Sequence, residues 1–323
     1  METALSWWDL DKTYLRTDFD SARELLRAAF EGSASKRTHV GADSLMSATR
    51  EFGAQTHIIS GSPRQMGGVI ARKFRLDNVT IDSLTLKPNV ANVLRLRFRA
   101  VRGQIGYKLP AALATLRHAR RVRVLALGDD SEADTFIYSL AGDIMAGNIE
   151  MPLLAEVLHL AGAYDDDIAR IVSLATELSG AGHVSRILIH LERRTALARF
   201  APYGPRVVPF YNYMQAAHIC FDSGWLDGKG LCSVACAMVE RHLFDGDQLA
   251  RSYNELVARG VLTSAAPIAE DILQNASMHT TQAALKIWHE AMLQHASDAR
   301  PPRTWRGVPD YLGLASTHNW RHQ

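Results

Sequence analysis

The stretch ALSWWDLDKT, residues 4–13, joins a short apolar run to two carboxylates that stand two residues apart. The apolar run predicts a buried strand near the N-terminus, and Asp9 and Asp11 would then lie at its carboxyl end. Two buried carboxylates that converge on one point repel each other unless a cation or a proton stabilises them. The stretch therefore indicates metal-assisted chemistry, although turns and helix caps also produce short patterns of this kind.

The composition is that of a globular protein of one large domain or two smaller ones. The chain has 323 residues, of which 47% are hydrophobic, and a formal net charge of +2, so overall charge predicts neither a nucleic-acid nor a membrane partner. Cys220, Cys232 and Cys236 fit neither a disulfide framework nor a usual zinc pair, and we expect reduced thiols. Because we find no signal peptide and no transmembrane segment, we expect a cytoplasmic protein, which could still attach to a membrane surface.

Short apolar strands alternate with helical segments along the first two thirds of the chain. The strands are expected at 4–10, 56–60, 93–99, 122–127, 186–191 and 206–211, and the helices at 20–31, 43–52, 64–74 and 109–120. Pro110 would lie in the first turn of the last of these helices. This alternation predicts an α/β fold with a doubly wound, mostly parallel sheet.

Two helical stretches interrupt or follow that alternation. Residues 142–183 read as a helical insertion in a first domain of residues 1–226, and residues 227–300 read as a helical C-terminal region. A polar tail is expected at 301–323. The apolar stripes of the C-terminal helices could pack on the core, form a dimer or lie on a membrane. The 266–297 segment has no basic polar face, which argues against membrane binding by that helix.

Four chemically distinctive pieces stand at predicted strand ends or helix starts. They are the Asp9–Asp11 pair, Ser60 after its strand, Lys108 just before the helix at 109–120, and the acidic segment 128–134 after the strand at 122–127. In a doubly wound sheet the carboxyl ends of the strands share one edge, where ligands bind. The helix and strand between Lys108 and Asp129 have similar lengths, so we expect both side chains at that edge, beside Asp9.

In this order the pieces resemble the four motifs of the haloacid dehalogenase superfamily. The chain is similar to its phosphatidate phosphatase-like branch over about residues 1–226, outside 142–183. The similar segments are DLDKTYLRT (9–17), SGSP (60–63), GDDSEAD (128–134), the strand at 186–191 and FYNYMQAA (210–217). The chain departs from the branch at Lys12, where an acid is usual, and at Asp130-Ser131, where Ser-Gly is usual. The resemblance implies a Rossmann-like sheet and a Mg²⁺-dependent phosphatase.

The resemblance also implies a role for each residue of the motifs. Asp9 would be the nucleophile that forms an aspartyl-phosphate, and Asp11 would move the proton. Ser60 would donate to a phosphoryl oxygen, Lys108 would offset negative charge, and Thr13 would order the loop. Asp9, the backbone carbonyl of Asp11 and Asp129 would bind Mg²⁺, with Asp134 as a ligand or an orienting group. Supporting or substrate-binding roles would fall to Gly61, Ser62, Arg64 and Asp130.

Other interpretations stay open for the substrate and for single residues. Arg95, Arg97 and Arg99 share one face of a predicted strand and could bind an anionic substrate, but a solvated edge strand is favoured. The segment from Arg72 to Arg123 holds thirteen Lys or Arg and two acids, which suits an anionic substrate. A phosphatidate or related lipid phosphate is expected from the resemblance. The alternatives are a phosphatase for nucleic-acid ends or a soluble metabolite, and an inactive scaffold that binds a protein partner through its C-terminal helices.

Overall fold

The chain folds into two compact units. The computed structural model describes residues 2–16, 37–87, 101–117, 121–131, 133–241, 244–262, 268, 270, 273, 279–295 and 307–317. Unit 1 takes the described residues within 1–37, 55–209 and 305–323, and unit 2 takes those within 38–54 and 210–304. This division differs from the expected boundary at residue 226. The predicted helix at 20–31 and the predicted strand at 93–99 lie outside the described residues.

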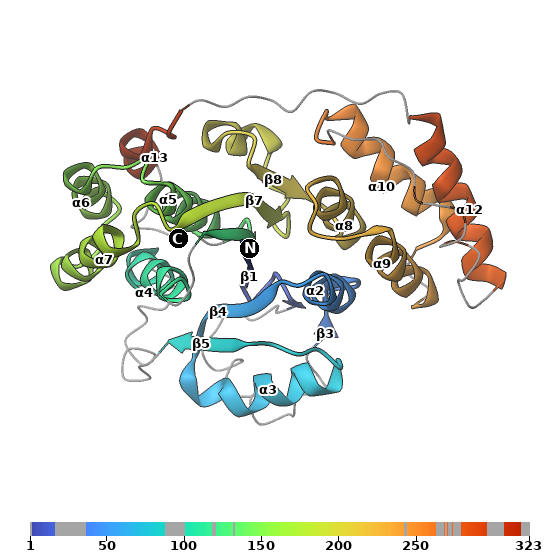
Figure 1. Ribbon diagram of the computed structural model, residues 1–323, viewed down its shortest axis with the longest axis horizontal. Helices are drawn as coiled ribbons and strands as arrows, with labels where there is room; N and C mark the ends of the chain where they lie inside the picture. The colour runs from blue at the N-terminus through green and yellow to red at the C-terminus, as the bar shows by residue number, and fades with distance from the viewer. Residues whose placement is uncertain are drawn as a thin grey trace. The chain divides into compact units, whose positions relative to one another are not determined.

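Unit 1 contains a six-stranded sheet with the order β5-β4-β1-β6-β7-β8 (Figure 1). Its strands are β1 (Thr3–Trp8), β4 (Gln55–Pro63), β5 (Ser83–Lys87), β6 (Val122–Asp129), β7 (Gly182–His190) and β8 (Val207–Phe210). β1 pairs in parallel with β4 on one side and with β6 on the other, and β4–β5 and β6–β7 are parallel pairs too. The predicted parallel sheet of an α/β, Rossmann-like fold is therefore confirmed.

Three strands have no counterpart in the pattern read from the sequence. β5 is the first strand in the sheet order, and only Leu86 of its five residues is buried. Such an edge strand lacks the continuous apolar run by which the inner strands were expected. The short strands β2 (Leu15–Arg16) and β3 (Arg37–Thr38) form a separate two-stranded sheet.

Unit 1 also contains helices. They are η2 (Arg64–Met66), α3 (Gly67–Leu76), α4 (Val101–Ala114), α5 (Asp134–Ala146), α6 (Met151–Leu160), α7 (Asp165–Leu178), η4 (Leu197–Tyr203) and α13 (Tyr311–Thr317). α5 packs on β6 and β7, α4 packs on β4 and α5, and α7 packs on α4 and α6. The stretch 142–183, expected to be a helical insertion, therefore contains only the end of α5 together with α6 and α7, and α5 covers the sheet directly.

The helix that carries Lys108 begins earlier than expected. α4 starts at Val101, so Lys108 lies about two turns inside it and Pro110 occupies its interior rather than its first turn. A proline inside a helix leaves the carbonyl four residues before it without its usual donor. The carbonyl of Gly106 accepts a hydrogen bond of 2.5 Å from the Arg170 guanidinium of α7 instead.

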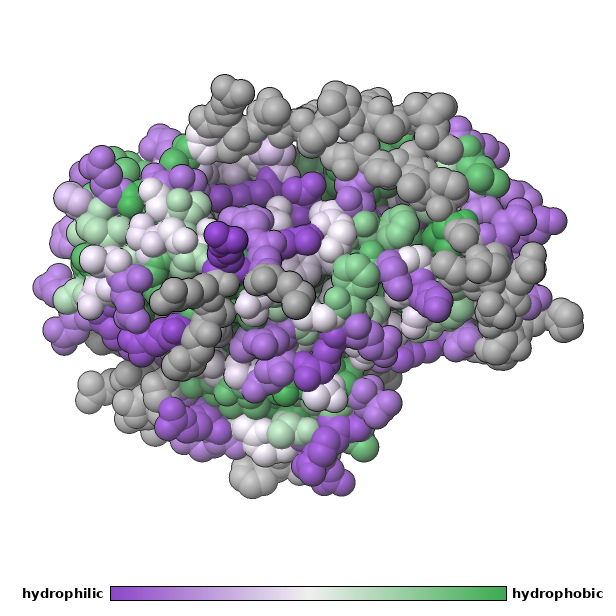
Figure 2. All heavy atoms as spheres, in the orientation of Figure 1, coloured by the Kyte–Doolittle hydropathy of each residue, from purple (hydrophilic) through white to green (hydrophobic). Residues whose placement is uncertain are grey.

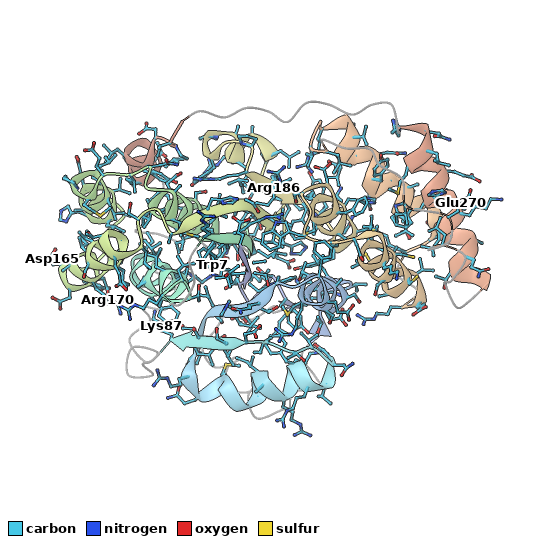
Figure 3. All side chains as sticks on the ribbon, viewed as in Figure 1. Trp7, Lys87, Asp165, Arg170, Arg186 and Glu270 are labelled. Carbon is cyan, nitrogen blue, oxygen red and sulfur yellow. The ribbon has the colours of Figure 1, made fainter. Side chains whose placement is uncertain are left out.

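Trp7 ties the first strand to α4. Its side chain is fully buried in the core of unit 1 (Figure 3). The indole N–H donates to the hydroxyl of Thr115, just after α4, at 2.9 Å. Trp7 precedes Asp9 by two residues, so this bond fixes α4 against the segment that carries the two carboxylates.

The expected polar tail contains a packed helix. Tyr311, at the start of α13, is 2% exposed, and its hydroxyl donates a short hydrogen bond to the Asp143 carboxylate. Arg206 binds the same carboxylate at 2.9 and 2.5 Å, and donates to the Tyr311 oxygen at 3.2 Å. A buried carboxylate needs such partners, and together they hold α13 in unit 1. The polar composition around α13 gave no indication in the sequence that Tyr311 packs in unit 1.

The outer helices of unit 1 present a mixed surface. Figure 2 shows purple hydrophilic residues beside pale and green ones over the region of α6 and α7. The large exposed apolar side chains there are Leu153, Leu160 and Tyr164. None of the helices in the described part of the chain combines the length and the apolar character that crossing a membrane requires.

Unit 2 is helical. Its helices are α2 (Ala42–Glu51), α8 (Tyr213–Asp222), α9 (Gly228–Glu240), α10 (Gly246–Ala258) and α12 (His279–Gln294). α2 packs on α8 and α9, and α10 packs on α8 and α12. Arg241, just after α9, forms a bidentate ion pair with the Asp43 carboxylate of α2, with N–O distances of 2.9 and 2.5 Å. α2 joins this unit because its buried face meets α9, which sequence order alone did not indicate.

The core of unit 2 holds a neutral histidine, which predicts a dependence of its stability on pH. His218 accepts a hydrogen bond of 3.0 Å from the Trp288 indole N–H, and burial lowers its pKa from 6.5 to about 3. Between these values the unfolded chain binds a proton that the folded chain does not. The free energy of unfolding should therefore fall as the pH is lowered through this window, by about 1.4 kcal/mol per pH unit.

Hydrogen exchange of α8 and α10 amides between pH 6.5 and pH 4, corrected for intrinsic exchange, measures this slope. The matched variant is His218→Gln, which cannot titrate in this range. Subtracting its slope from that of the wild type isolates the contribution of His218. Equal slopes for the two proteins would show that His218 is not held neutral by the fold.

Candidate functional site

A buried lysine joins two aspartates at the carboxyl edge of the sheet. The Lys108 ammonium lies 2.7 Å from Oδ1 of Asp9 and 2.5 Å from Oδ1 of Asp134. Asp9 directly follows β1, and its backbone N–H continues the ladder to the carbonyl of Leu127 at 2.9 Å. All three charged side chains are at most 1% exposed. Charge-assisted hydrogen bonds of this length are strong, and they fix all three groups in one arrangement.

Asp129 completes the cluster from the neighbouring strand. It is the last residue of β6 and is fully buried. Its backbone N–H donates to Oδ2 of Asp134 at 3.3 Å. Its own carboxylate accepts from the backbone N–H of Ser131 at 2.6 Å and from the Ser131 hydroxyl. Asp9, Asp129 and Asp134 thus offer carboxylate oxygens that lie within 4.8 Å of one another.

The cluster holds more acidic than basic side chains among the described residues. Three buried carboxylates lie around one buried ammonium, which pairs with two of them. Gathering carboxylates in a buried place is costly, and a divalent cation would lower that cost. Carboxylate oxygens are the hard ligands that Mg²⁺ prefers. The residues present therefore fit a bound Mg²⁺ ion.

Asp11 stands beside the cluster with two serine hydroxyls. Its carboxylate is only partly buried and accepts a hydrogen bond of 2.7 Å from Ser62. Ser60 is fully buried; its hydroxyl lies 3.5 Å from the same oxygen and accepts from the backbone N–H of Ser62 at 3.0 Å. Ser62 is therefore the closer partner of Asp11, although the motif resemblance predicted the leading role for Ser60.

The loop that carries Asp11 is tightly wound. Lys12 has a left-handed backbone with a φ of 61°, and its N–H donates to the carbonyl of Leu15 at 2.8 Å. Nδ1 of His190, the last residue of β7, lies 3.0 Å from the carbonyl of Lys12. Thr13, in the same loop, is fully buried. His190 supports this loop from a distant part of the chain, and no motif in the sequence points to it.

Asp130 holds another loop at the same edge. Its carboxylate accepts the backbone N–H groups of Arg193 at 2.8 Å and of Thr195 at 2.9 Å. This loop follows β7, and its Arg194 has a left-handed backbone with a φ of 54°. The expected supporting role of Asp130 thus takes the form of loop positioning, because both carboxylate oxygens are engaged by the backbone.

Two other predicted residues lie on the strand beside β1. Gly61 lies in β4, and a Cβ atom at this position would meet nothing within 4 Å. Arg64 begins η2 just after β4 and is exposed. The structure therefore places all the described site candidates from β1, β4, α4 and β6 at one sheet edge, while Arg95, Arg97 and Arg99 lie outside the described residues.

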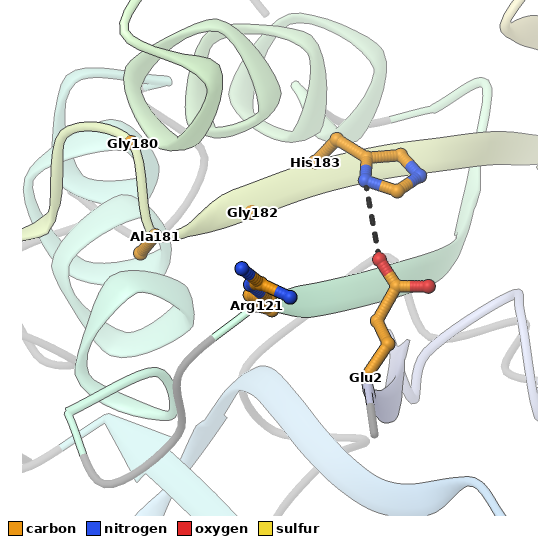
Figure 4. Close-up of a pocket in the computed structure, with 6 residues that line it drawn as sticks. All are labelled: Glu2, Arg121, Gly180, Ala181, Gly182 and His183. Atoms are coloured by element: carbon orange, nitrogen blue, oxygen red, sulfur yellow. Dashed lines mark ion pairs between the residues drawn. The ribbon is translucent and has the colours of Figure 1, made fainter.

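A hollow of about 470 Å³ lies at the other edge of the sheet (Figure 4). It is lined by residues at or near the starts of β1, β6 and β7, namely Glu2, Arg121 and 180–183. Nδ1 of His183 lies 3.6 Å from the Glu2 carboxylate. The hollow lies at the amino ends of the strands, whereas the aspartate cluster lies at their carboxyl ends, where parallel sheets usually bind ligands. The two sites are therefore separate.

Gly128 makes the close approach of Asp134 possible. A Cβ atom at Gly128 would lie 2.5 Å from Cβ of Asp134 and 2.6 Å from its Oδ2. Gly128→Ala should therefore displace Asp134 from Lys108 and lower the free energy of unfolding by about 2 kcal/mol. Urea unfolding measures the loss. Gly61→Ala is the matched control because its Cβ enters open space, and equal stability of the two variants would contradict the packing argument.

Comparisons with known proteins found no match for this chain. No family model matches it, and neither a curated protein nor a solved structure does. The chemistry of the site must therefore be inferred from its own residues. Those residues are a buried carboxylate–ammonium cluster and a second, partly exposed carboxylate held by serine hydroxyls.

Proposed function

We propose that this protein is a Mg²⁺-dependent phosphomonoester hydrolase of the haloacid dehalogenase type, which works through an aspartyl-phosphate on Asp9. The observation that carries the proposal is the placement of Lys108, whose ammonium binds Asp9 and Asp134 beside Asp129. A turn or a helix cap requires no such buried lysine. The partly exposed Asp11 on the adjoining loop adds the second carboxylate that acid–base chemistry needs.

Asp9 is suited to nucleophilic attack. The ammonium of Lys108, 2.7 Å away, favours the ionised form of this carboxylate, and an ionised oxygen is required for attack on phosphorus. In the first step the Asp9 oxygen bonds to phosphorus as the ester P–O bond breaks. Lys108 stays beside Asp9 and stabilises the negative charge that gathers there.

Asp11 is suited to moving the proton in both steps. When protonated, it gives its proton to the oxygen of the leaving alcohol. The resulting carboxylate then takes a proton from water, which attacks the phosphorus of the aspartyl-phosphate. This second step frees Asp9 and releases inorganic phosphate. The Ser62 hydroxyl, 2.7 Å from Asp11, fixes the direction of the carboxyl group, and Ser60 would donate to a phosphoryl oxygen.

The metal would be held by Asp9, Asp129 and the backbone carbonyl of Asp11. Both oxygens of Asp134 are engaged, one by Lys108 at 2.5 Å and one by the Asp129 N–H at 3.3 Å. Asp134 therefore serves to orient Lys108 and the end of β6. When bound, Mg²⁺ neutralises phosphoryl charge and holds the phosphoryl group in line with the nucleophile.

The substrate class within the phosphomonoesters follows from resemblance alone, which favours phosphatidate or a related lipid phosphate. A panel of phosphate esters with Mg²⁺ tests both levels of the proposal. It contains p-nitrophenyl phosphate, phosphatidate in micelles, lysophosphatidate, sugar phosphates, nucleotides and phosphorylated oligonucleotide ends. Mg²⁺-dependent phosphate release, lost with EDTA, is the expected result. A folded protein that releases phosphate from none of them would return the chain to the scaffold interpretation.

Salt dependence separates the two kinds of substrate. Binding of an oligonucleotide end should weaken steeply as salt is raised, because each phosphate contact releases counterions. Hydrolysis of a small monoester should change far less. A preference for lipid phosphate with weak salt dependence would support the branch resemblance, and steep salt dependence would favour the nucleic-acid alternative.

A further inference from the structure

Tyr107 carries a buried hydroxyl group next to the proposed catalytic lysine. It precedes Lys108 in α4, and its hydroxyl oxygen is shielded from solvent without a hydrogen-bond partner among the described residues. The great majority of buried polar groups in folded proteins do have a partner. A phenylalanine would fill the same space without this cost, so packing alone does not explain the oxygen.

The charges around this hydroxyl are those of the site. Burial has the largest effect on the pKa of Tyr107 and raises it well above the ordinary value of 10. The positive charges of Lys108 and Arg64 lower this pKa, and the negative charge of Asp9 raises it. The phenol thus lies within electrostatic reach of the nucleophile, the lysine and the exposed arginine after β4. The raised pKa keeps the phenol protonated near neutral pH, so it can donate a hydrogen bond but cannot act as a base there.

We propose that the Tyr107 hydroxyl is a substrate-binding donor, which bonds to a non-bridging phosphoryl oxygen of the bound phosphomonoester. The assignment rests on the proposed function, to which it adds a residue that no motif indicates. A phosphoryl group has several oxygens that accept hydrogen bonds, and Lys108 and Ser60 alone would not supply a donor to each of them. Binding of the phosphoryl group would supply the acceptor that the buried hydroxyl does not have among the described residues.

Tyr107→Phe tests the assignment because it removes one oxygen and leaves the ring. Calorimetric titration with inorganic phosphate in the presence of Mg²⁺ measures binding of the phosphoryl group alone. We expect the Kd to rise by about ten- to a hundred-fold, the usual effect of losing a hydrogen bond to a charged group. The kcat/KM for p-nitrophenyl phosphate should fall by a similar factor, and the Tm should stay unchanged or rise.

Tyr203→Phe is the matched control, since Tyr203 is a buried tyrosine of unit 1 in η4, and this substitution should leave phosphate binding unchanged. An unchanged phosphate Kd in Tyr107→Phe would overturn the assignment, even if kcat/KM fell, because the contact would then lie elsewhere. A lowered Tm with normal binding would also overturn it, by showing a structural hydroxyl. Because phosphate binding is measured without turnover, wild-type protein that binds phosphate but hydrolyses no ester would refute the proposed function and not the Tyr107 contact.

Discussion

Asp9→Asn is expected to lower kcat for Mg²⁺-dependent hydrolysis of p-nitrophenyl phosphate by about 10⁴-fold or more. The amide keeps the size of the side chain but cannot attack phosphorus. The fold should survive, because Lys108 retains its bond of 2.5 Å to Asp134. Steady-state rates at saturating Mg²⁺ measure the loss, and circular dichroism checks the fold.

A second buried aspartate in unit 1 provides the control for Asp9. Asp143 is 2% exposed and binds Arg206 and Tyr311, in α5 away from the cluster. Asp143→Asn should lower stability, since it weakens a buried ion pair, while the folded protein keeps its kcat. A variant at Asp9 that retained more than about a tenth of the wild-type kcat would remove this residue from the nucleophile role.

Lys108→Met is expected to cost unit 1 about 3–5 kcal/mol of unfolding free energy in the absence of divalent cations. It leaves Asp9, Asp129 and Asp134 buried together without their ammonium partner. Mg²⁺ should restore part of the loss, because a cation bound only by the folded state stabilises it. Thermal unfolding with and without Mg²⁺ measures both effects. The kcat should also fall by at least about a hundred-fold, since the charge that faces the nucleophile is lost.

Lys73→Met is the control that distinguishes the loss of the Lys108 ion pairs from the general effect of losing a buried lysine. Lys73 of α3 is 8% exposed and pairs with Asp77, four residues later. Its loss removes one ion pair without leaving a group of carboxylates, so a smaller cost and no added response to Mg²⁺ are expected. Equal costs for the two variants, with no rescue of Lys108→Met by Mg²⁺, would contradict the charge balance inferred for the cluster.

The parallel sheet could be predicted because its inner strands are continuous apolar runs. β1, β6 and β7 are covered on both faces in the core and therefore carry the pattern of buried strands. β5 lacks that pattern because it lies at the edge of the sheet. The predicted start of α4 was wrong because a proline is usually found in the first turn of a helix. Here Pro110 lies inside the helix, and Arg170 donates to the carbonyl of Gly106 that the proline leaves without its usual donor.

The main charged residues of the site could be predicted because strand ends meet at one edge of a parallel sheet. Asp9 and Asp129 follow that rule directly, and Lys108 reaches Asp9 from inside α4. The contacts of His190 and Ser62 and the place of Tyr107 could not be predicted in the same way. They depend on the register between β7 and β6, on the path of β4 past its bulge, and on the rotation of α4, none of which a motif encodes.

An acyl phosphate on Asp9 is the species whose detection tests the proposed chemistry most directly. Wild-type protein would be mixed with Mg²⁺ and radiolabelled aryl phosphate, quenched in acid within one turnover, and digested. We expect label on the peptide that contains Asp9, sensitive to hydroxylamine as an acyl phosphate is, and absent from Asp9→Asn. Turnover by the wild type with no labelled protein, or with label on another residue, would contradict the role of Asp9 as the nucleophile.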